Sequence, residues 1–249
     1  MTADRPHEST ATAAQIGSVA EPVTSLDDPR ALTILTTEHW SLLSARSLAY
    51  NEAFVRGGMF LTFLSMSFVA LALFSSAMSF DDDFLTVAAV VLAFDFVIGI
   101  TTYARITGAN LDDMRAVHGM ARIRHGYTQI APITTPFFTT PLHDDPAGIG
   151  LAYGDQSTSM PGVLFYGLTT SGGMIGLILS MVGGVLTAVL ALLAGVTGGA
   201  ALAIGFGGAV VVFGALVWLT VGAVPREQGK LTALFPTPTG DARQNTDRP

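Results

Sequence analysis

The residue of this chain best placed to do chemistry is Asp95, the only charged residue between positions 84 and 104. An ionisable group inside a bilayer is costly and usually faces the protein interior. No Lys, Arg or His lies at a similar depth in the other apolar stretches, so we expect a neutral, protonated carboxyl group. Ser65 and Ser67 lie at a matching depth and could hydrogen-bond it. Two roles stay open: a polar contact that joins two helices, or a proton- or cation-binding site.

The histidines do not form a recognisable metal or haem site. All five lie outside the apolar stretches, at positions His7, His39, His118, His125 and His143. A bis-histidine haem within the membrane needs ligands that face each other across the bilayer, and these histidines do not supply them. His118 and His125 share a helical face but stand two turns apart, too far for a simple chelate. We expect no metal and no cofactor.

Other chemistry is also disfavoured. The acidic run Asp81-Asp82-Asp83 could attract a cation, but a solvated turn is the simpler interpretation. The chain has no P-loop, no G-x-S-x-G, no HExxH and no dinucleotide fingerprint. It also has no cysteine, and its 12 basic residues are too few for a nucleic-acid binder. We therefore expect neither an enzyme nor a nucleic-acid partner.

The elements that would position these residues are transmembrane helices. Half of the 249 residues are hydrophobic and 12% are charged, against about 25% charged in soluble domains. Stretches long enough to cross a bilayer run over residues 57–80, 84–105, 173–194 and 200–222, the last two joined at Gly195–Gly199. We predict an all-α membrane protein whose four transmembrane helices form two hairpins.

The basic residues predict the orientation. Four precede residue 57, four lie between 105 and 124, and four follow residue 225, while both short turns have none. By the positive-inside rule both termini and the long loop are cytoplasmic, and the protein sits in a plasma membrane with lipid around it. The predicted divisions are a disordered tail (1–27), a first hairpin with helical extensions (28–126), a Pro-rich loop (127–172), a second hairpin (173–224) and a tail (225–249).

The first hairpin is expected to continue into the cytoplasm as a helical stalk. Asp28-Pro29 is a typical helix start, and apolar residues recur on one face from there to the membrane. An antiparallel pair that turns at 81–83 would bring Glu38 near His125 and Arg46 near Val117. In the loop, the stretch APITTPFFTTPL is predicted to be extended.

The second hairpin carries small residues at four-residue spacing, which lets helices approach closely in lipid. The two expected ridges consist of Gly172, Gly176, Ser180 and Gly184 in the third span and Gly199, Ala203 and Gly207 in the fourth. They favour a tight intramolecular hairpin, with a subunit interface as the alternative.

The segment EHWSLLSARSLAYNEAFVRGGMFLTFLS (residues 38–65) resembles the opening of uncharacterised actinobacterial integral membrane proteins. The order of stalk helix, two spans and stalk helix is also similar to SLATT-type proteins, which lack the second hairpin. These resemblances imply a bacterial membrane protein and carry no activity. We expect a non-enzymatic structural or interaction component with a homo-oligomeric or membrane-protein partner; the alternative is a small channel or transporter that uses Asp95.

Overall fold

The computed structural model describes residues 22–78, 81–153 and 167–238, and their regular structure is entirely helical. Two very long helices, α1 (Pro29–Met78) and α2 (Asp82–Ile130), are followed by a short 3-10 helix η2 (Pro132–Phe137) and the short helix α3 (Pro146–Ala152). Two further long helices, α5 (Ser171–Leu193) and α6 (Gly199–Gln228), follow. The predicted all-α class is thus confirmed for the described residues.

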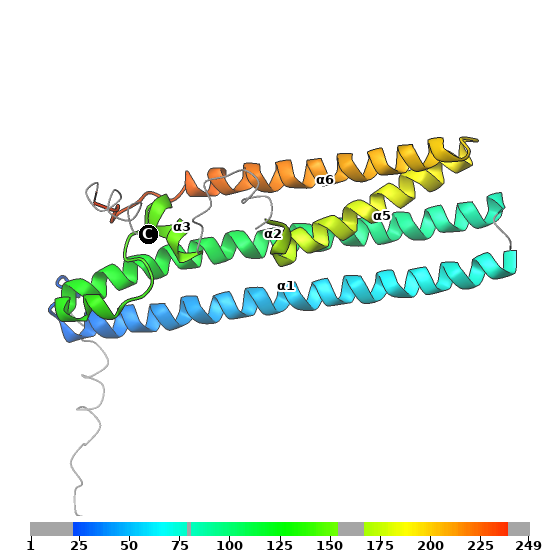
Figure 1. The fold of residues 1–249 in the computed structure, drawn as a ribbon. Helices are drawn as coiled ribbons and strands as arrows, with labels where there is room; N and C mark the ends of the chain where they lie inside the picture. The colour runs from blue at the N-terminus through cyan, green and yellow to red at the C-terminus, as the bar shows by residue number, and fades with distance from the viewer. Residues whose placement is uncertain (1–21, 79–80, 154–166, 239–249) are drawn as a thin grey trace, which may run out of the picture.

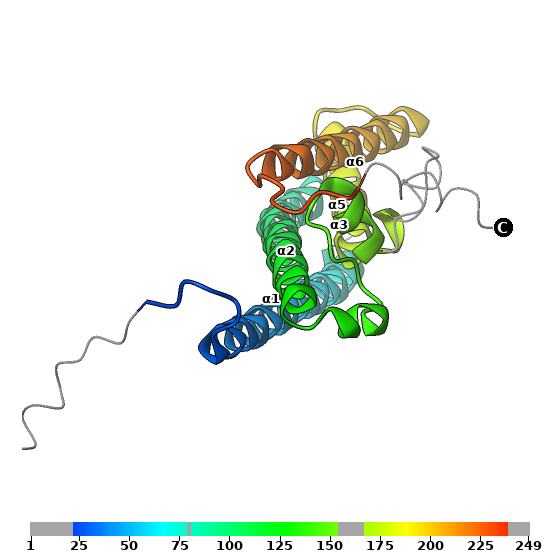
Figure 2. The same cartoon turned by 90° about the vertical axis from the view of Figure 1, so that its left-hand side faces the viewer.

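Helix α2 is the central element. It packs against α1 on one side and α5 on another, and α6 lies against α5 (Figures 1 and 2). The end of α1, the start of α2 and the α5–α6 turn lie at the same end of the molecule, whereas η2, α3 and residues 229–238 gather at the opposite end (Figure 1).

All four long helices are long and apolar enough to cross a membrane. The 50 residues of α1 and 49 of α2 make each about 75 Å long at 1.5 Å per residue. That is more than twice the ~30 Å thickness of a bilayer's hydrocarbon core. Each of these two helices therefore has an apolar half and a second half that extends well beyond it.

Local chemistry explains both connections at the first end. Asp81 accepts a hydrogen bond from the backbone N–H of Phe84 and caps α2, and Asp82 and Asp83 lie in its first turn, where negative charge is favourable. Between α5 and α6, Gly195 and Gly198 have φ angles of +85° and +61°. Glycine adopts these angles without strain, which explains the reversal there.

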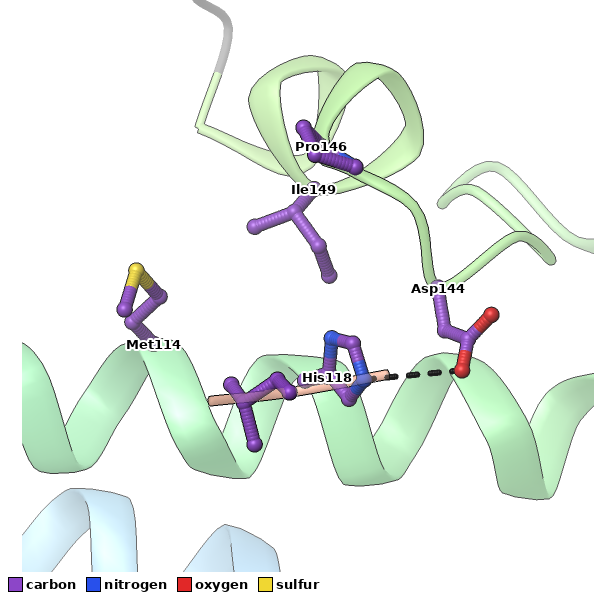
Figure 3. Close-up of a pocket in the computed structure, with 6 residues that line it drawn as sticks. Met114, His118, Asp144, Pro146 and Ile149 are labelled. Carbon is purple, nitrogen blue, oxygen red and sulfur yellow. Dashed lines mark ion pairs between the residues drawn. The ribbon is translucent and has the colours of Figure 1, made fainter. Parts of the chain in front are cut away.

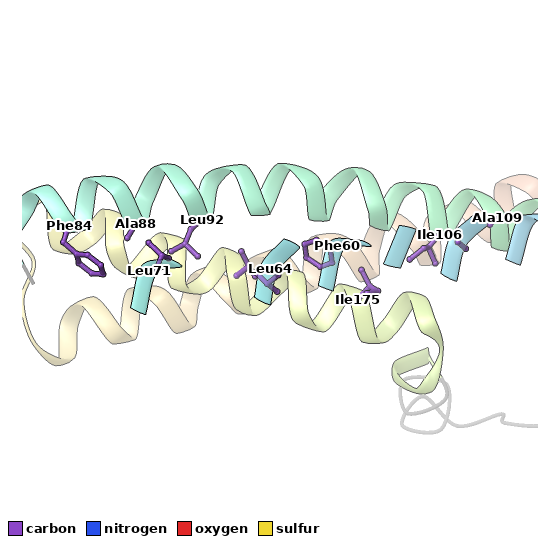
Figure 4. Packing of buried hydrophobic residues seen from close by; sticks show 11 residues of the cluster. Phe60, Leu64, Leu71, Phe84, Ala88, Leu92, Ile106, Ala109 and Ile175 are labelled. Atoms are coloured by element: carbon purple, nitrogen blue, oxygen red, sulfur yellow. The ribbon is translucent and has the colours of Figure 1, made fainter. Parts of the chain in front are cut away.

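The main core lies between α1, α2 and α5. Phe60 and Leu64 of α1 meet Leu92 and Ile106 of α2, with Ile175 of α5 beside them (Figure 4). In lipid no hydrophobic force drives helices together, so close packing of this kind, with hydrogen bonds, must hold them.

Several stretches differ from the sequence-based expectation. Residues 132–137, predicted to be extended, form η2, because Pro132 suits a first helical turn and the Thr134 hydroxyl closes a bond to the carbonyl of Ala131. The apolar span of the fourth helix, Gly199–Ala223, lies close to the expected 200–222, and the helix continues past it to Gln228. Residues 231–238, here called the C-terminal segment, return to the α2–α3 region. The expected tail residues 1–21 and 239–249 and the loop residues 154–166 lie outside the described residues.

Candidate functional site

Asp95 lies between α1 and α2 with 1% of its surface exposed. The Ser67 hydroxyl of α1 donates a hydrogen bond of 3.0 Å to Oδ1 of Asp95. Within the described part of the chain, Oδ2 of Asp95 is buried and has no hydrogen-bond partner. The site can therefore join two helices through one polar contact, and it keeps one buried oxygen unused.

Ser65 is placed differently from the expectation. Its hydroxyl donates to the backbone carbonyl of Leu61, one turn earlier in α1, and its side chain lies on the outer face of the helix beside Met66 and Val69. A helical residue two positions from Ser67 points away from it by more than half a turn. Of the two serines, Ser67 is the one that contacts Asp95.

The ridge of α5 makes two different close contacts. A Cβ atom on Gly184 would come within 2.8 Å of the Ala209 Cβ and the Gly205 carbonyl of α6, and one on Gly176 within 2.9 Å of the Tyr103 ring of α2. Ser180 is buried and donates to the carbonyl of Gly176. The glycines thus allow α5 to pack closely against both α2 and α6.

The predicted ridge of α6 points elsewhere. A Cβ on Gly199 or Gly207 would meet nothing within 4 Å, and Ala203 is exposed. The residues that face α5 are shifted by one to two positions, with Ala201 buried and Gly205 against Ala188. The sequence pattern did not reveal this shift, because α6 contains other glycines, Gly205 and Gly208, beside the predicted ridge. The Tyr103 hydroxyl, 2.6 Å from the Thr220 hydroxyl, adds a polar link between α2 and α6.

Beyond the apolar halves, α1 and α2 are joined by charges. Asp113 of α2 is 1% exposed, and both its carboxylate oxygens accept hydrogen bonds from the guanidinium of Arg46 in α1. Tyr153, just after α3, donates a third bond to Asp113. Burial and the adjacent Asp113 raise the pKa of Tyr153, so its hydroxyl stays protonated and available as a donor.

This pairing differs in detail from the one expected for an antiparallel pair of helices that turns at residues 81–83. Arg46 was expected beside Val117, but its long side chain reaches one turn along α2 to Asp113. Glu38 is exposed, and the adjacent His39 is the residue that faces α2, with its ring centroid 6.1 Å from that of Tyr127. Nearer the apolar halves, Glu52 pairs with Arg105 at 2.7 Å and with Arg56 at 3.0 Å.

A second buried carboxylate, Asp144, fastens the C-terminal segment to α2. It accepts hydrogen bonds from Arg122 of α2 at 2.7 Å and from the backbone N–H groups of Leu234 and Phe235 at 2.9 and 2.7 Å. Arg122 also donates to the carbonyl of Thr232. Burial alone would raise the pKa of Asp144, but these donors outweigh it and hold the pKa below its usual value.

Histidines surround this contact. His118 lies 3.4 Å from Asp144 (Figure 3), and His125 stacks on Phe235 with ring centroids 4.0 Å apart. Burial lowers the pKa of both His118 and His125, and it outweighs the nearby Asp144, which acts in the opposite direction. The cavity that His118 and Asp144 line with Met114 and Ile149 measures about 20 Å³, room for one water molecule and far below the several hundred Å³ of a substrate pocket.

Asp113, Asp144 and Tyr153 were not identified from the sequence. Asp145-Pro146 repeats the Asp-Pro helix start of residues 28–29, and Asp145 does cap α3, so that signal was present. Arg46 on an apolar helix face also implied a buried acidic partner. Which acid fills that role depends on long-range pairing that local patterns do not encode.

Among the described residues no cluster of three or more His, Asp or Glu side chains could hold a metal ion. No protein-family model matches the chain, and neither a curated protein nor a solved structure matches it.

Proposed function

We propose that this protein is a non-enzymatic structural or interaction component of a bacterial plasma membrane. Two transmembrane hairpins anchor it, both termini are cytoplasmic, and the extended halves of α1 and α2 form a cytoplasmic stalk (residues 29–56 and 106–130). The stalk would hold a small head, made of η2, α3 and the C-terminal segment, at a defined distance from the bilayer.

The observation that carries the proposal is the way the head is attached. The 28 residues of α1 before position 57 span about 42 Å as a helix. Buried carboxylates at Asp113 and Asp144 tie α1, α3 and the C-terminal segment to the single helix α2. Breaking such a buried pair is costly, so this construction favours a rigid arm that presents a surface.

Crosslinking in native membranes, followed by affinity purification of the intact protein, tests the proposal. A reproducible protein partner should be recovered that crosslinks through the stalk or the head, and Asp144→Asn should reduce its recovery. Asp112→Asn is the control, because Asp112 is half-exposed and its ion pair within the described residues is with Arg115 of its own helix. Partners that crosslink through the apolar halves alone, or equal recovery from both variants, would count against it.

The alternative is a small channel or transporter in which Asp95 binds a proton or a cation. The observation that favours it is that Oδ2 of Asp95 is buried and has no hydrogen-bond partner among the described residues, since intramembrane acids often mark ion pathways. Purified protein in liposomes with a pH-sensitive dye would then show a flux that Asp95→Asn abolishes while the fold is retained. Equal proton flux in the variant, or none in either protein, would exclude a proton pathway through Asp95.

A further inference from the structure

The half of α1 that precedes the apolar span carries an exposed face. Thr36, Trp40, Leu43, Ser47, Tyr50 and Phe54, here called the α1 stripe, follow one another in alternating steps of four and three residues. All six are exposed: Trp40 and Phe54 by 62% and 64%, and Leu43 and Tyr50, which lie nearer α2, by 37% and 36%. The Tyr50 side chain also interacts with Asp113 of α2. In the bilayer lipid would cover such residues, but this part of α1 lies before the span at 57–80. Exposed apolar surface in water marks an interaction site.

The spacing indicates what covers the stripe. Apolar residues at alternating steps of three and four form the seam of a coiled coil, in which each side chain inserts between residues of a facing helix. The stripe continues this pattern over six consecutive seam positions, with Thr36 and Ser47 as its polar members. A single helix packed lengthwise is therefore the occupant that fits it.

Charge indicates which helix this is. Copies of one chain enter the membrane in the same orientation, so two α1 helices would meet in parallel with each residue opposite its equivalent. Like charges at such positions would repel. The stripe has none: Arg46 and Glu52 bind Asp113 and Arg105 of α2, and Glu38 lies on the opposite side of the helix.

We propose that two copies of the chain form a parallel dimer through the α1 stripe, about a two-fold axis along the membrane normal. The small residues of α5 and α6 are not needed for this contact. The proposal rests on the proposed placement of the stalk outside the bilayer and assigns it a partner, a second copy of the same chain.

The chain contains no cysteine, so a single introduced thiol reports pairing directly. Ser47→Cys lies on the stripe, and Ser41→Cys is the matched control, since both serines are exposed but their side chains point about 120° apart around the helix. On mild oxidation in native membranes, Ser47→Cys should form a disulfide-linked species at twice the 26.0 kDa chain mass, while Ser41→Cys should stay monomeric. No crosslink from Ser47→Cys, or equal crosslinking from both variants, would overturn the proposal.

A charge placed on the stripe supplies the second test. Leu43→Lys added to Ser47→Cys should reduce the crosslinked fraction by roughly tenfold or more, because two like charges would face each other. Leu48→Lys, on an exposed residue outside the stripe, should leave it unchanged; equal loss with both lysines would contradict the stripe as the interface. Labelling of Ser41→Cys and Ser47→Cys by a membrane-impermeant maleimide, before and after permeabilisation, reports the side of the stalk separately. A wrong topology is thereby distinguished from a failed dimer.

Discussion

At the scale of residues, two neighbouring aspartates show how context decides the value of a charge. Asp113 is buried and binds Arg46 and Tyr153, whereas Asp112 is half-exposed and pairs with Arg115 one turn away. Surface pairs of the second kind contribute little, because solvent screens them and side-chain entropy opposes them. When a buried carboxylate is replaced by an amide, one of its two acceptor oxygens becomes a donor group, and the paired guanidinium loses its counter-charge.

We therefore expect Asp113→Asn to destabilise the stalk by about 1–3 kcal/mol and Asp112→Asn by less than about 0.5 kcal/mol. Thermal unfolding of the two purified variants in the same detergent, followed by circular dichroism, measures the difference. Equal melting temperatures for the two variants would show that Arg46 and Tyr153 do not depend on Asp113.

The sequence predicted some of the residue contacts of the site and missed others. It placed Ser67 at the depth of Asp95, because two apolar stretches of similar length face each other across a short turn. It could not choose between Ser65 and Ser67, since that depends on the rotation of α1 about its axis. The buried carboxylates Asp113 and Asp144 were not predicted, because their hydrogen-bond partners lie in other elements of the fold.

At the scale of elements, the glycines of α5 and α6 are not equivalent. Gly184 lies in contact with Gly205 and Ala209 of α6, and Gly207 faces outward. Gly184→Leu should therefore separate α5 from α6 and lower the stability by about 1–3 kcal/mol, as overpacking does. Gly207→Leu should be tolerated. Resistance to proteolysis at the Gly195–Gly199 turn, compared in membranes for the two variants, tests this; greater sensitivity in Gly207→Leu would contradict the packing.

The C-terminal segment should loosen in mild acid. Burial lowers the pKa of His118 and His125 when the C-terminal segment is packed against α2. The protein therefore binds fewer protons with the segment packed than with the segment detached. Stability that depends on neutral histidine is complete above the ordinary value of 6.5 and is lost as the pH falls below it. The lowered pKa of Asp144 adds stability that is lost only at more acidic pH, below its ordinary 3.8.

Hydrogen exchange at the amides of Leu234 and Phe235 measures this loosening. After correction for intrinsic rates, exchange should be faster at about pH 5.5 than at about pH 7.5, on either side of the usual histidine pKa. His125→Phe, which keeps a ring against Phe235 but cannot titrate, should weaken the dependence. The same protection at both pH values would show that the histidines do not control the segment.

The element scale also shows where patterns fail. Apolar stretches predicted four helices long enough to cross a membrane, and the described residues contain four such helices. Proline-rich composition suggested extended chain at 132–137, but proline also suits a first helical turn, and the local Thr–carbonyl bonds favour η2. Residues 225–249 were predicted only as a tail, and the composition of that tail does not indicate that its residues 231–238 are held by a carboxylate 90 residues earlier in the chain.

At the scale of the whole molecule, the geometry and the charge distribution agree. The two short turns lie at one end, and the head lies at the other (Figure 1). The turns carry no basic residue, and the nine basic residues of the described ranges all belong to the segments on the other side of the apolar stretches. This distribution supports one orientation in the membrane, with the head in the cytoplasm.

Thiol labelling in intact cells tests this orientation most directly, since the chain has no cysteine of its own. A membrane-impermeant maleimide should label Thr197→Cys, in the α5–α6 turn, without permeabilisation. It should label Ser41→Cys, in the stalk, only after permeabilisation. Labelling of Ser41→Cys in intact cells, or protection of Thr197→Cys, would contradict the account of a membrane-anchored cytoplasmic stalk.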